Sequence, residues 1–333
     1  MVRRGIVNIT EGSPSGASNS NNLGVGSPSS PNPGSPPSSK VGFSYAYVTN
    51  YGSNTVSVIK VSTNTVVATV SVGTGPFGVA ITPDGSYAYV VNTGSNTVSV
   101  IKVSTNTVVA TVTVESGPQG VAITPDGSYA YVVNTGSGTA SVIQISTNTV
   151  IATITVGASP QYIAITPDGD YAYVTNHDSN TVSVIQTSTN TVVATVSGVS
   201  GPSGVAITPD GNYAYVANNS STTVSVIQVS TNTVIATVSI GTTPRGIAIT
   251  SDGSYVYVAD IDSSSVSVIQ VSTNTVVATI SVGTSPYNVA ITPDGNYAYV
   301  PSYGLNTVSV IQVSTNTVIA TVTVGTKPIG VAT

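Results

Sequence analysis

The sequence contains no cysteine and no tryptophan, and it has one histidine and one methionine among 333 residues. Without cysteine, the chain can form no disulfide, no thiolate nucleophile and no cysteine-ligated metal site. Charged side chains are also scarce, at 6% of the residues against roughly 25% in an ordinary globular domain. The surface must therefore consist largely of Ser, Thr, Asn and Gly.

Basic residues are fewer than acidic ones, and the formal net charge is -5. Nucleic-acid binding depends on Lys and Arg that neutralise phosphates, so we expect no nucleic-acid partner. No stretch approaches the roughly 18 continuous apolar residues that span a bilayer, so we expect no membrane span. The abundance of hydroxyl and amide side chains suits an extracellular or cell-surface protein, which is the predicted location.

What the sequence has is a repeat with a fixed period of 42 residues. A YAYV or YVYV motif begins at Tyr45, Tyr87, Tyr129, Tyr171, Tyr213, Tyr255 and Tyr297. An STNTV motif recurs at the same spacing, from Ser62 to Ser314. This period is typical of a four-stranded propeller blade of about 40 to 45 residues.

Each period contains four short segments rich in β-branched and aromatic residues, for example GVAIT, SYAYVVN, TVSVIKV and VVATVSV. The first copy lacks the GVAIT segment, whereas the sequence ends with a segment of this kind, IGVAT, at residues 329–333. We therefore predict an all-β, seven-bladed propeller over residues 41–333, closed when the C-terminal strand completes the first blade. Residues 11–40 read as a Ser/Pro/Gly-rich linker, and residues 1–10 as a detached segment with strand character.

The sequence YVTN itself occurs at residues 47–50 and 173–176, beside TPDG turns and VSVI segments. In these motifs the propeller region resembles the YVTN-repeat β-propellers. That resemblance implies a protein of the surface-layer or cell-surface type, although the fold is shared by adhesive, structural and catalytic proteins. The chain departs from the family where Lys60, Lys102 and Gln144 replace a frequent Asp.

The outer segment of every repeat lacks charge and proline, and such strand edges accept an added strand. The hexapeptide GIVNIT at residues 5–10 is a donor on a long tether, with Ile6, Val7 and Ile9 as the residues to be buried. We therefore expect a non-enzymatic structural protein that self-assembles with copies of itself into a filament or array. The opposing interpretation is a leader segment without a partner. The rival functions are a surface adhesin or carbohydrate- or protein-binding propeller, with glycans or other surface proteins as partners, and, more remotely, a propeller hydrolase.

The loops that enter the inner strands place a variable residue directly after a proline. Strand order puts these loops on the rim opposite the PDG and STNT turns, near the central channel, where we expect any ligand to bind. Neutral drift after duplication is the alternative explanation of their variation. The candidates are Phe77, Gln119, Gln161, Ser203, Arg245, Tyr287 and Ile329.

Catalytic and metal-binding signals are weak. His177 is the single histidine and precedes Asp178 in a variable loop, so both are kept as ligand-binding candidates, but no nucleophile motif accompanies them. Asp260 and Asp262 offer carboxylate oxygens without a calcium-loop pattern. We expect no catalytic residue, metal or cofactor. Glycosylation sequons occur at Asn8, Asn218 and Asn219.

Overall fold

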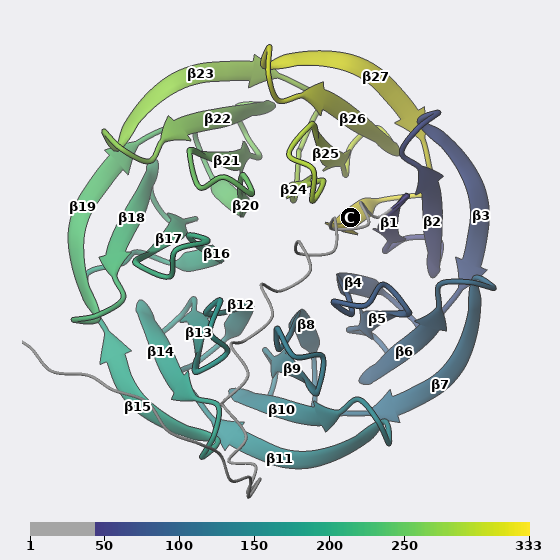
Figure 1. Ribbon diagram of the computed structural model, residues 1–333, viewed down its shortest axis with the longest axis horizontal. Coiled ribbons are helices and arrows are strands. Elements are labelled where there is room, and N and C mark those ends of the chain that lie inside the picture. The colour runs from purple at the N-terminus through teal and green to yellow at the C-terminus, as the bar shows by residue number, and fades with distance from the viewer. Residues whose placement is uncertain (1–43) are drawn as a thin grey trace, which may run out of the picture. The chain divides into compact units, whose positions relative to one another are not determined.

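The computed structural model describes residues 44–333, which form seven four-stranded antiparallel sheets around a central axis (Figure 1). The predicted seven-bladed all-β propeller is confirmed. The two N-terminal segments lie outside the described residues, together with the donor residues Ile6, Val7 and Ile9 and the sequon residue Asn8. Strand donation and self-pairing through these residues are therefore not tested by the structure.

Each blade has an inner, a second, a third and an outer strand, counted from the axis outwards. The inner strands are β4 (Pro76–Ile81), β8 (Pro118–Ile123), β12 (Pro160–Ile165), β16 (Pro202–Ile207), β20 (Pro244–Ile249), β24 (Ala290–Ile291) and β28 (Pro328–Ala332). The second strands are β1 (Tyr45–Asn50), β5 (Tyr87–Asn92), β9 (Tyr129–Asn134), β13 (Tyr171–Asn176), β17 (Tyr213–Asn218), β21 (Tyr255–Asp260) and β25 (Tyr297–Ser302).

The remaining strands complete the sheets. The third strands are β2 (Thr55–Lys60), β6 (Thr97–Lys102), β10 (Thr139–Gln144), β14 (Thr181–Gln186), β18 (Thr223–Gln228), β22 (Ser265–Gln270) and β26 (Thr307–Gln312). The outer strands are β3 (Thr65–Ser71), β7 (Thr107–Thr113), β11 (Thr149–Thr155), β15 (Thr191–Val196), β19 (Thr233–Ser239), β23 (Thr275–Ser281) and β27 (Thr317–Thr323). Blade 1 is β28-β1-β2-β3, and blades 2 to 7 follow in chain order from β4.

The ring closes within blade 1, as the sequence predicts. Strand β28 pairs antiparallel with β1, so that Val331 lies opposite Val48 and Ala332 opposite Tyr47. Because a closed ring leaves no unpaired blade at either end, closure joins the first and last repeats into one continuous structure.

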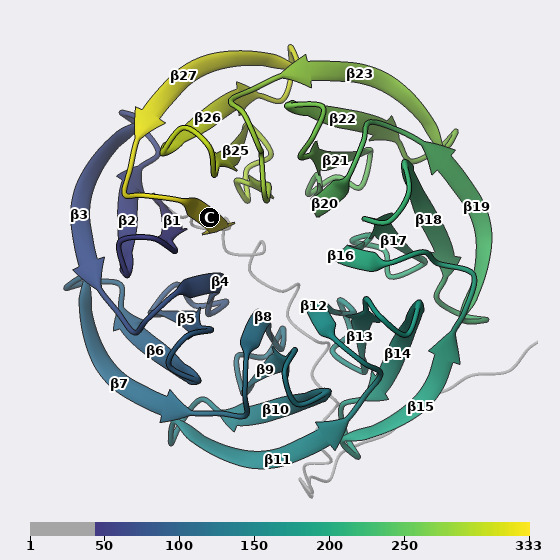
Figure 2. The ribbon, with the colours of Figure 1, turned by 180° about the vertical axis from the view of Figure 1, so that it is seen from behind.

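Two kinds of connection separate the two faces of the ring. On the hairpin face, the backbone N–H of Val103, after a third strand, donates to the carbonyl of Ser86 in a PDG hairpin, at 2.9 Å. On the loop face, shown in Figure 2, the N–H of Thr93 donates to the carbonyl of Gly75 at 2.9 Å and joins the loop between second and third strands to the loop entering the inner strand. The predicted division of turns between the two rims is therefore correct.

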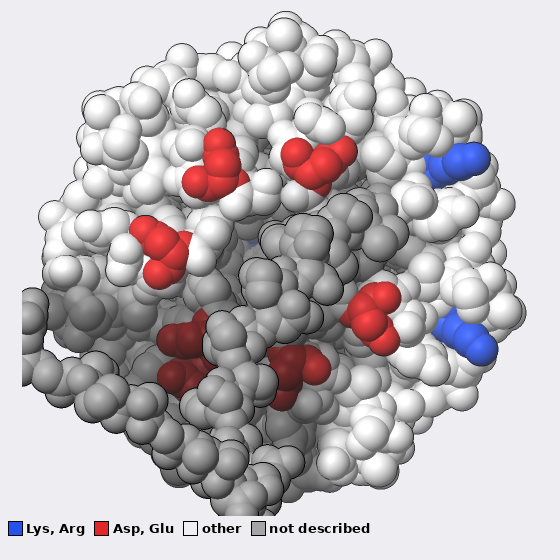
Figure 3. Space-filling view, viewed as in Figure 1, with Lys and Arg blue, Asp and Glu red and all other residues white. Residues whose placement is uncertain are grey.

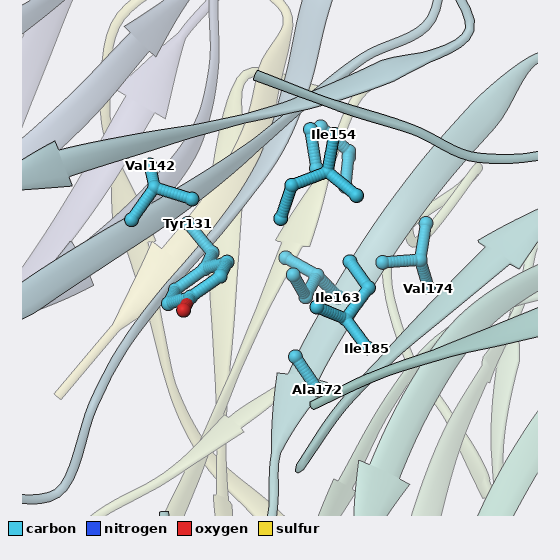
Figure 4. Close-up of a cluster of buried hydrophobic side chains, with 9 residues drawn as sticks. Tyr131, Val142, Ile154, Ile163, Ala172, Val174 and Ile185 are labelled. Atoms are coloured by element: carbon cyan, nitrogen blue, oxygen red, sulfur yellow. The ribbon is translucent and has the colours of Figure 1, made fainter. Parts of the chain in front are cut away.

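The apolar core lies between neighbouring blades. Between blades 3 and 4, Tyr131 faces Ala172 and Val174 across the interface (Figure 4). A large side chain on one sheet against small ones on the next lets the sheets interdigitate. The hydroxyl of Tyr131 also donates to Oδ1 of Asn190, in a turn of blade 4, at 2.7 Å. An equivalent tyrosine–asparagine bond crosses every blade interface.

The outer strands carry half-exposed valines around the circumference, such as Val67 at 49% and Val109 at 51% exposed. Within residues 44–333, the structure contains no helix that could cross a membrane.

Candidate functional site

The inner strands approach one another closely because most of them carry glycine after the variable residue. A Cβ atom on Gly120 would lie 2.7 Å from the carbonyl oxygen of Gln161 on the next inner strand. Only a residue without a side chain permits this approach, so the variable residue just before it is held in a crowded ring of strands. Two blades depart from the pattern, with Tyr162 and Asn288 in the place of glycine.

Three aromatic side chains from different blades meet where the inner strands converge. The ring centroid of Phe77, in blade 2, lies 5.7 Å from that of Tyr287, in blade 7, and 6.5 Å from that of Tyr162, in blade 4. Both pairs have the edge-to-face geometry that aromatic rings prefer. Because the three rings come from separate parts of the circle, their contacts place them at the propeller axis.

A single cation joins this aromatic group. The guanidinium carbon of Arg245, on β20 of blade 6, lies 4.0 Å from the ring centroid of Tyr287 and 5.8 Å from that of Phe77. Cation–π contact with two rings holds the side chain in place while the arginine keeps its charge. A half-buried guanidinium surrounded by aromatic rings attracts an anion strongly, since little water screens it.

Polar atoms of side chains on the inner strands of blades 3 to 6 are buried without hydrogen-bond partners. They are Oε1 of Gln119, Oε1 of Gln161, the hydroxyl oxygens of Tyr162 and Ser203, and Nε of Arg245. Ser203 is completely buried. A buried polar atom without a partner costs free energy, and several of them together indicate a place for a ligand or water. We call Phe77, Gln119, Gln161, Tyr162, Ser203, Arg245 and Tyr287 the axial site.

The phenols of the axial site are hydrogen-bond donors at neutral pH. Burial raises the pKa of Tyr162, and the positive charge of Arg245 opposes this rise without cancelling it. Burial likewise raises the pKa of Tyr287, again against the charge of Arg245. Both hydroxyls therefore stay protonated, and neither acts as a general base.

A second group of aromatic and basic side chains lies on the loop face between blades 7 and 1. Tyr303 stacks on Tyr287 with 5.9 Å between the ring centroids, and Nζ of Lys327 lies 5.6 Å from the centroid of Tyr303. The N–H of Tyr51 donates to the carbonyl of Lys327 at 3.0 Å. We call Tyr51, Tyr303 and Lys327 the rim platform. The stack of Tyr303 on Tyr287 makes it continuous with the axial site.

The hairpin face is acidic. Carboxylates surround its centre in Figure 3. Five PDG hairpins and the SDG hairpin of blade 6 each carry one: Asp84, Asp126, Asp168, Asp210, Asp252 and Asp294. Their turns explain them. Oδ1 of Asp84 accepts bonds from Oγ1 of Thr82 at 2.6 Å and from the N–H of Ser86 at 3.0 Å. These bonds, led by that from Thr82, lower the pKa of Asp84. Two cavities of about 340 and 270 Å³ lie between neighbouring hairpins.

His177 and Asp178 lie in a separate loop contact of blade 4. Nδ1 of His177 is 2.8 Å from Oδ1 of Asp178, and the hydroxyl of Ser159 donates to the other carboxylate oxygen. In this order the carboxylate lies between serine and histidine, so the imidazole does not contact the hydroxyl that it would have to deprotonate. In blade 6, Thr243 donates to Asp262 in the same way, so this hydrogen bond between two loops is a structural contact.

Asp260 is a buried carboxylate at the end of β21. Asparagine occupies this position in five blades, and in blade 1 the amide nitrogen of Asn50 donates to Oγ of Ser57 at 2.9 Å. At Asp260 the direction of the hydrogen bond is reversed, because the carboxylate can only accept: Ser267 donates to its Oδ2 at 2.6 Å. Burial raises the pKa of Asp260 to about 6, against the hydrogen bonds from Ser267 and Ser265. In the part of the chain that the structure describes, no three His, Asp or Glu side chains form a metal-binding group.

The two sequons of blade 5 differ in accessibility. Asn218 is 2% exposed, and its amide nitrogen donates to Thr223 and Ser225, so this sequon is buried in the folded propeller. The amide nitrogen of Asn219 donates to the carbonyl of Pro244 at 3.2 Å and is partly accessible. Glycosylation of Asn219 stays a prediction.

Six of the seven variable residues named from the sequence are in the axial site: Phe77, Gln119, Gln161, Ser203, Arg245 and Tyr287. Ile329 is the equivalent residue of blade 1 and is buried. His177 and Asp178 belong instead to the separate loop contact of blade 4. Sequence reasoning missed Tyr162, Tyr51 and Tyr303. A signal was available, because the four tyrosines outside the YxY repeat positions are these three and Tyr287.

A family model described as "Lactonase, 7-bladed beta-propeller" matches residues 44–194 and 151–279 of the chain. Together the two matches cover most of the propeller. The first covers blades 2 and 3 completely, and the second extends into the outer strand of blade 6.

Several solved structures share the fold. Kuenenia stuttgartiensis hydrazine synthase is 24% identical, with a TM-score of 0.76 over 81% of this chain and 92% of that chain. A functionally unknown protein from Desulfotomaculum acetoxidans is 22% identical, with a TM-score of 0.78 over 86% and 98%. The dihydro-heme d1 dehydrogenase NirN is 15% identical, with a TM-score of 0.67 over 87% and 75%. At these identities the likeness shows the fold alone.

A short match joins the chain to the PE-PGRS family protein PE_PGRS18 of Mycobacterium tuberculosis, which is 62% identical over 37 residues. The matched segment is 11% of this chain and 8% of that protein's length. The match is shorter than one repeat, so it says nothing of the activity of either whole protein.

The family match corrects the predicted function. A propeller of the lactonase type points to an enzymatic or ligand-binding protein, so the prediction of a structural protein that assembles into filaments is wrong. The same match conflicts with the prediction that the chain is not an enzyme. The resemblance to YVTN-repeat propellers holds for the seven-bladed fold, and the match does not support the surface-layer type.

Proposed function

The chain belongs to the seven-bladed β-propeller lactonase family, and on that premise we propose that its axial site binds a small hydroxy acid or the lactone formed from one. The observation that carries this proposal is Arg245, the one charged side chain of the axial site, in contact with two aromatic rings and surrounded by buried, unpaired polar atoms. A ligand that supplied the missing partners would remove the cost of leaving these atoms buried.

The unpaired atoms complement the functional groups of such a ligand. Nε of Arg245 is a donor and suits a carboxylate or a lactone carbonyl. The Oε1 atoms of Gln119 and Gln161 are acceptors and suit ligand hydroxyl groups. The hydroxyls of Ser203 and Tyr162 can donate or accept. A mixture of one cation, two acceptors and two hydroxyls favours a small molecule with one acidic or carbonyl group and several hydroxyl groups.

The aromatic walls add to this selectivity. Phe77 is 6% exposed, and Tyr287 and Tyr162 are half-buried around the guanidinium. Exclusion of water by these rings strengthens the attraction between Arg245 and an anion. The expected preference is therefore for an acid over a neutral polyol of the same size.

Lactone hydrolysis is a second candidate, and family membership favours it. Arg245 is placed to stabilise the negative charge that develops on the carbonyl oxygen when water attacks. However, the residues of the axial site include no carboxylate and no imidazole, and their phenols stay protonated. Binding is therefore better supported than hydrolysis, which would need a base from outside this group of residues.

Calorimetric titration tests the proposal. The probes are gluconate, its δ-lactone and the neutral polyol sorbitol, added to the native protein and to the Arg245→Gln variant. We expect the native protein to bind the acid or the lactone and to bind sorbitol at least tenfold more weakly. The variant should lose this preference. Equal binding of all three probes, or an unchanged preference in the variant, would overturn the proposal. Release of protons from the lactone in a pH-stat, above the rate without protein, tests hydrolysis.

A further inference from the structure

The rim platform is built from residues that depart from the repeat. Tyr51 and Tyr303 occupy a position that is Thr93, Thr135 or Asn219 in three other blades. There the side chain donates to a proline carbonyl of the next blade, as Thr93 does to Pro118 at 2.6 Å. At Tyr51 and Tyr303, a phenol replaces the short side chain that forms this hydrogen bond. His177 and Ile261 also lack this bond, so within residues 44–333 it is absent from four blades, but only in the neighbouring blades 1 and 7 does a phenol take its place.

Lys327 differs from its equivalents in the other blades by its side chain. Its backbone has φ = 54°, and all of its equivalents also have positive φ: they are Gly75, Gly117, Ser159, Gly201, Thr243 and Ser285. The conformation is imposed by a repeated bond, since Oδ1 of Asn306 accepts from the N–H of Lys327 at 2.9 Å, as Asn54 does for Gly75. Because four of the seven blades have a non-glycine residue in this conformation, the backbone does not distinguish Lys327 from its equivalents; its positive charge does, since the others are glycine, serine or threonine.

These side chains form a series in which two stacked rings lie between two cations. Lys327 lies over Tyr303, Tyr303 stacks on Tyr287, and Tyr287 lies beneath Arg245. Lys327 is exposed and Tyr303 is half-buried, so the series runs from solvent on the loop face to the axial site. A ligand held by Arg245 therefore has a flat aromatic surface and a second positive charge along its way out.

We propose that the rim platform is an outer subsite and that the ligand is an acidic saccharide of at least two rings. This inference rests on the proposed function. The acid group of the first ring binds Arg245, the second ring lies against Tyr303, and the acid group of the second ring binds Lys327. The apolar C–H face of a sugar ring suits the flat face of a tyrosine, and its hydroxyls suit the amides and hydroxyls of the axial site. Two cations separated by stacked rings suit a carboxylate on each sugar.

The test compares digalacturonate with galacturonate by calorimetric titration against the native protein and two variants. Tyr303→Ala removes the stacking surface. Lys327→Gly removes the charge and places at this position the residue that three other blades have, so the variant should fold. Leu305→Ala is the matched control, because Leu305 is in the same loop, 51% exposed, and outside the series of rings and cations.

We expect the native protein and Leu305→Ala to bind digalacturonate about tenfold more tightly than galacturonate, with a second ion pair and a stacked ring as the cause. Tyr303→Ala and Lys327→Gly should reduce this ratio to about one while affinity for galacturonate is unchanged. Equal affinities for the two ligands in the native protein would overturn the inference, and so would an unchanged ratio in both variants. Absence of binding by either uronic acid would also overturn it. The proposed function fails separately, if gluconate and its lactone show no dependence on Arg245.

Discussion

The guanidinium carbon of Arg245, on β20, lies 4.0 Å from the ring centroid of Tyr287, in the segment that leads into β24 of the neighbouring blade. The ring orients the guanidinium and covers one face of it, while Nε remains buried and unpaired. A cation held in this way loses little conformational freedom when an anion binds. The contact therefore prepares the axial site for an acidic ligand.

Two substitutions of Arg245 distinguish the contribution of its charge to ligand affinity from the contribution of its planar shape. Arg245→Gln should weaken binding of a hydroxy acid by about 10- to 100-fold, because the ligand loses a charge-assisted hydrogen bond. The affinity of Arg245→Lys for the acid should lie between those of Arg245→Gln and the native protein, since lysine keeps the charge but cannot stack as a planar group on the ring. Calorimetric titration measures both. The control is Lys102→Gln, which removes a positive charge at the end of β6 and should leave the affinity unchanged.

Asp260 should destabilise the propeller at neutral pH. Its pKa in the folded state, about 6, lies above the value of about 3.9 in an unfolded chain. The unfolded chain therefore ionises first, and the stability present below pH 4 is lost as the pH rises through 6. Asp260→Asn restores the residue of five other blades and should raise the free energy of unfolding at pH 8 by roughly 2 to 3 kcal/mol, with little change at pH 4.

Urea denaturation at the two pH values measures this effect. Asp170→Asn is the matched control, because Asp170 is an exposed residue of a hairpin in blade 4. It should change the free energy of unfolding little at either pH. A gain from Asp260→Asn of the same size at pH 4 and pH 8 would show that ionisation is not the cause.

The tyrosine–asparagine bonds between blades should each stabilise the ring modestly. Tyr131→Phe removes the hydroxyl that donates to Asn190 and should lower the free energy of unfolding by about 0.5 to 1.5 kcal/mol. Tyr129→Phe is the control on the same strand, because its hydroxyl makes no hydrogen bond within residues 44–333. Thermal unfolding of the two variants checks the difference, and equal losses would contradict an energetic role for the bond.

His177 should be dispensable for binding and for any hydrolysis. The hydrogen-bond order of Ser159, Asp178 and His177 does not activate the serine. His177→Ala should therefore leave the affinity for gluconate, and any rate of lactone hydrolysis, within twofold of the native values. A loss of more than tenfold in either measurement would contradict this account of the loop.

The sequence predicts the fold almost completely because each strand, turn and blade contact is repeated at the same spacing. The glycine at φ = 71° in the first PDG turn and the Asn64 residue at φ = 52° both follow from turn chemistry that is legible in the sequence. Closure by β28 follows from the missing strand before Tyr45. The period, not any single motif, carries this information.

The axial site is less accessible to sequence reasoning, because its contacts join residues from four blades. The variable position after proline identifies Phe77, Arg245 and Tyr287, but only the closed ring brings blades 2, 6 and 7 together. Tyr162 was missed because it replaces a glycine that looks structural in the other repeats. The sequence assigns Asp260 no role beyond carboxylate oxygens without a calcium-loop pattern, and only the structure shows that it is buried in a position that holds asparagine in five blades.

A crystal structure of the protein soaked with gluconate tests the central claim most directly. We predict electron density for the acid at the axis, with its carboxylate on Arg245 and its hydroxyls on Gln119, Gln161 or Ser203. Density only between the hairpins of the acidic face, where Asp252 and Asp294 line the larger cavity, would contradict the account.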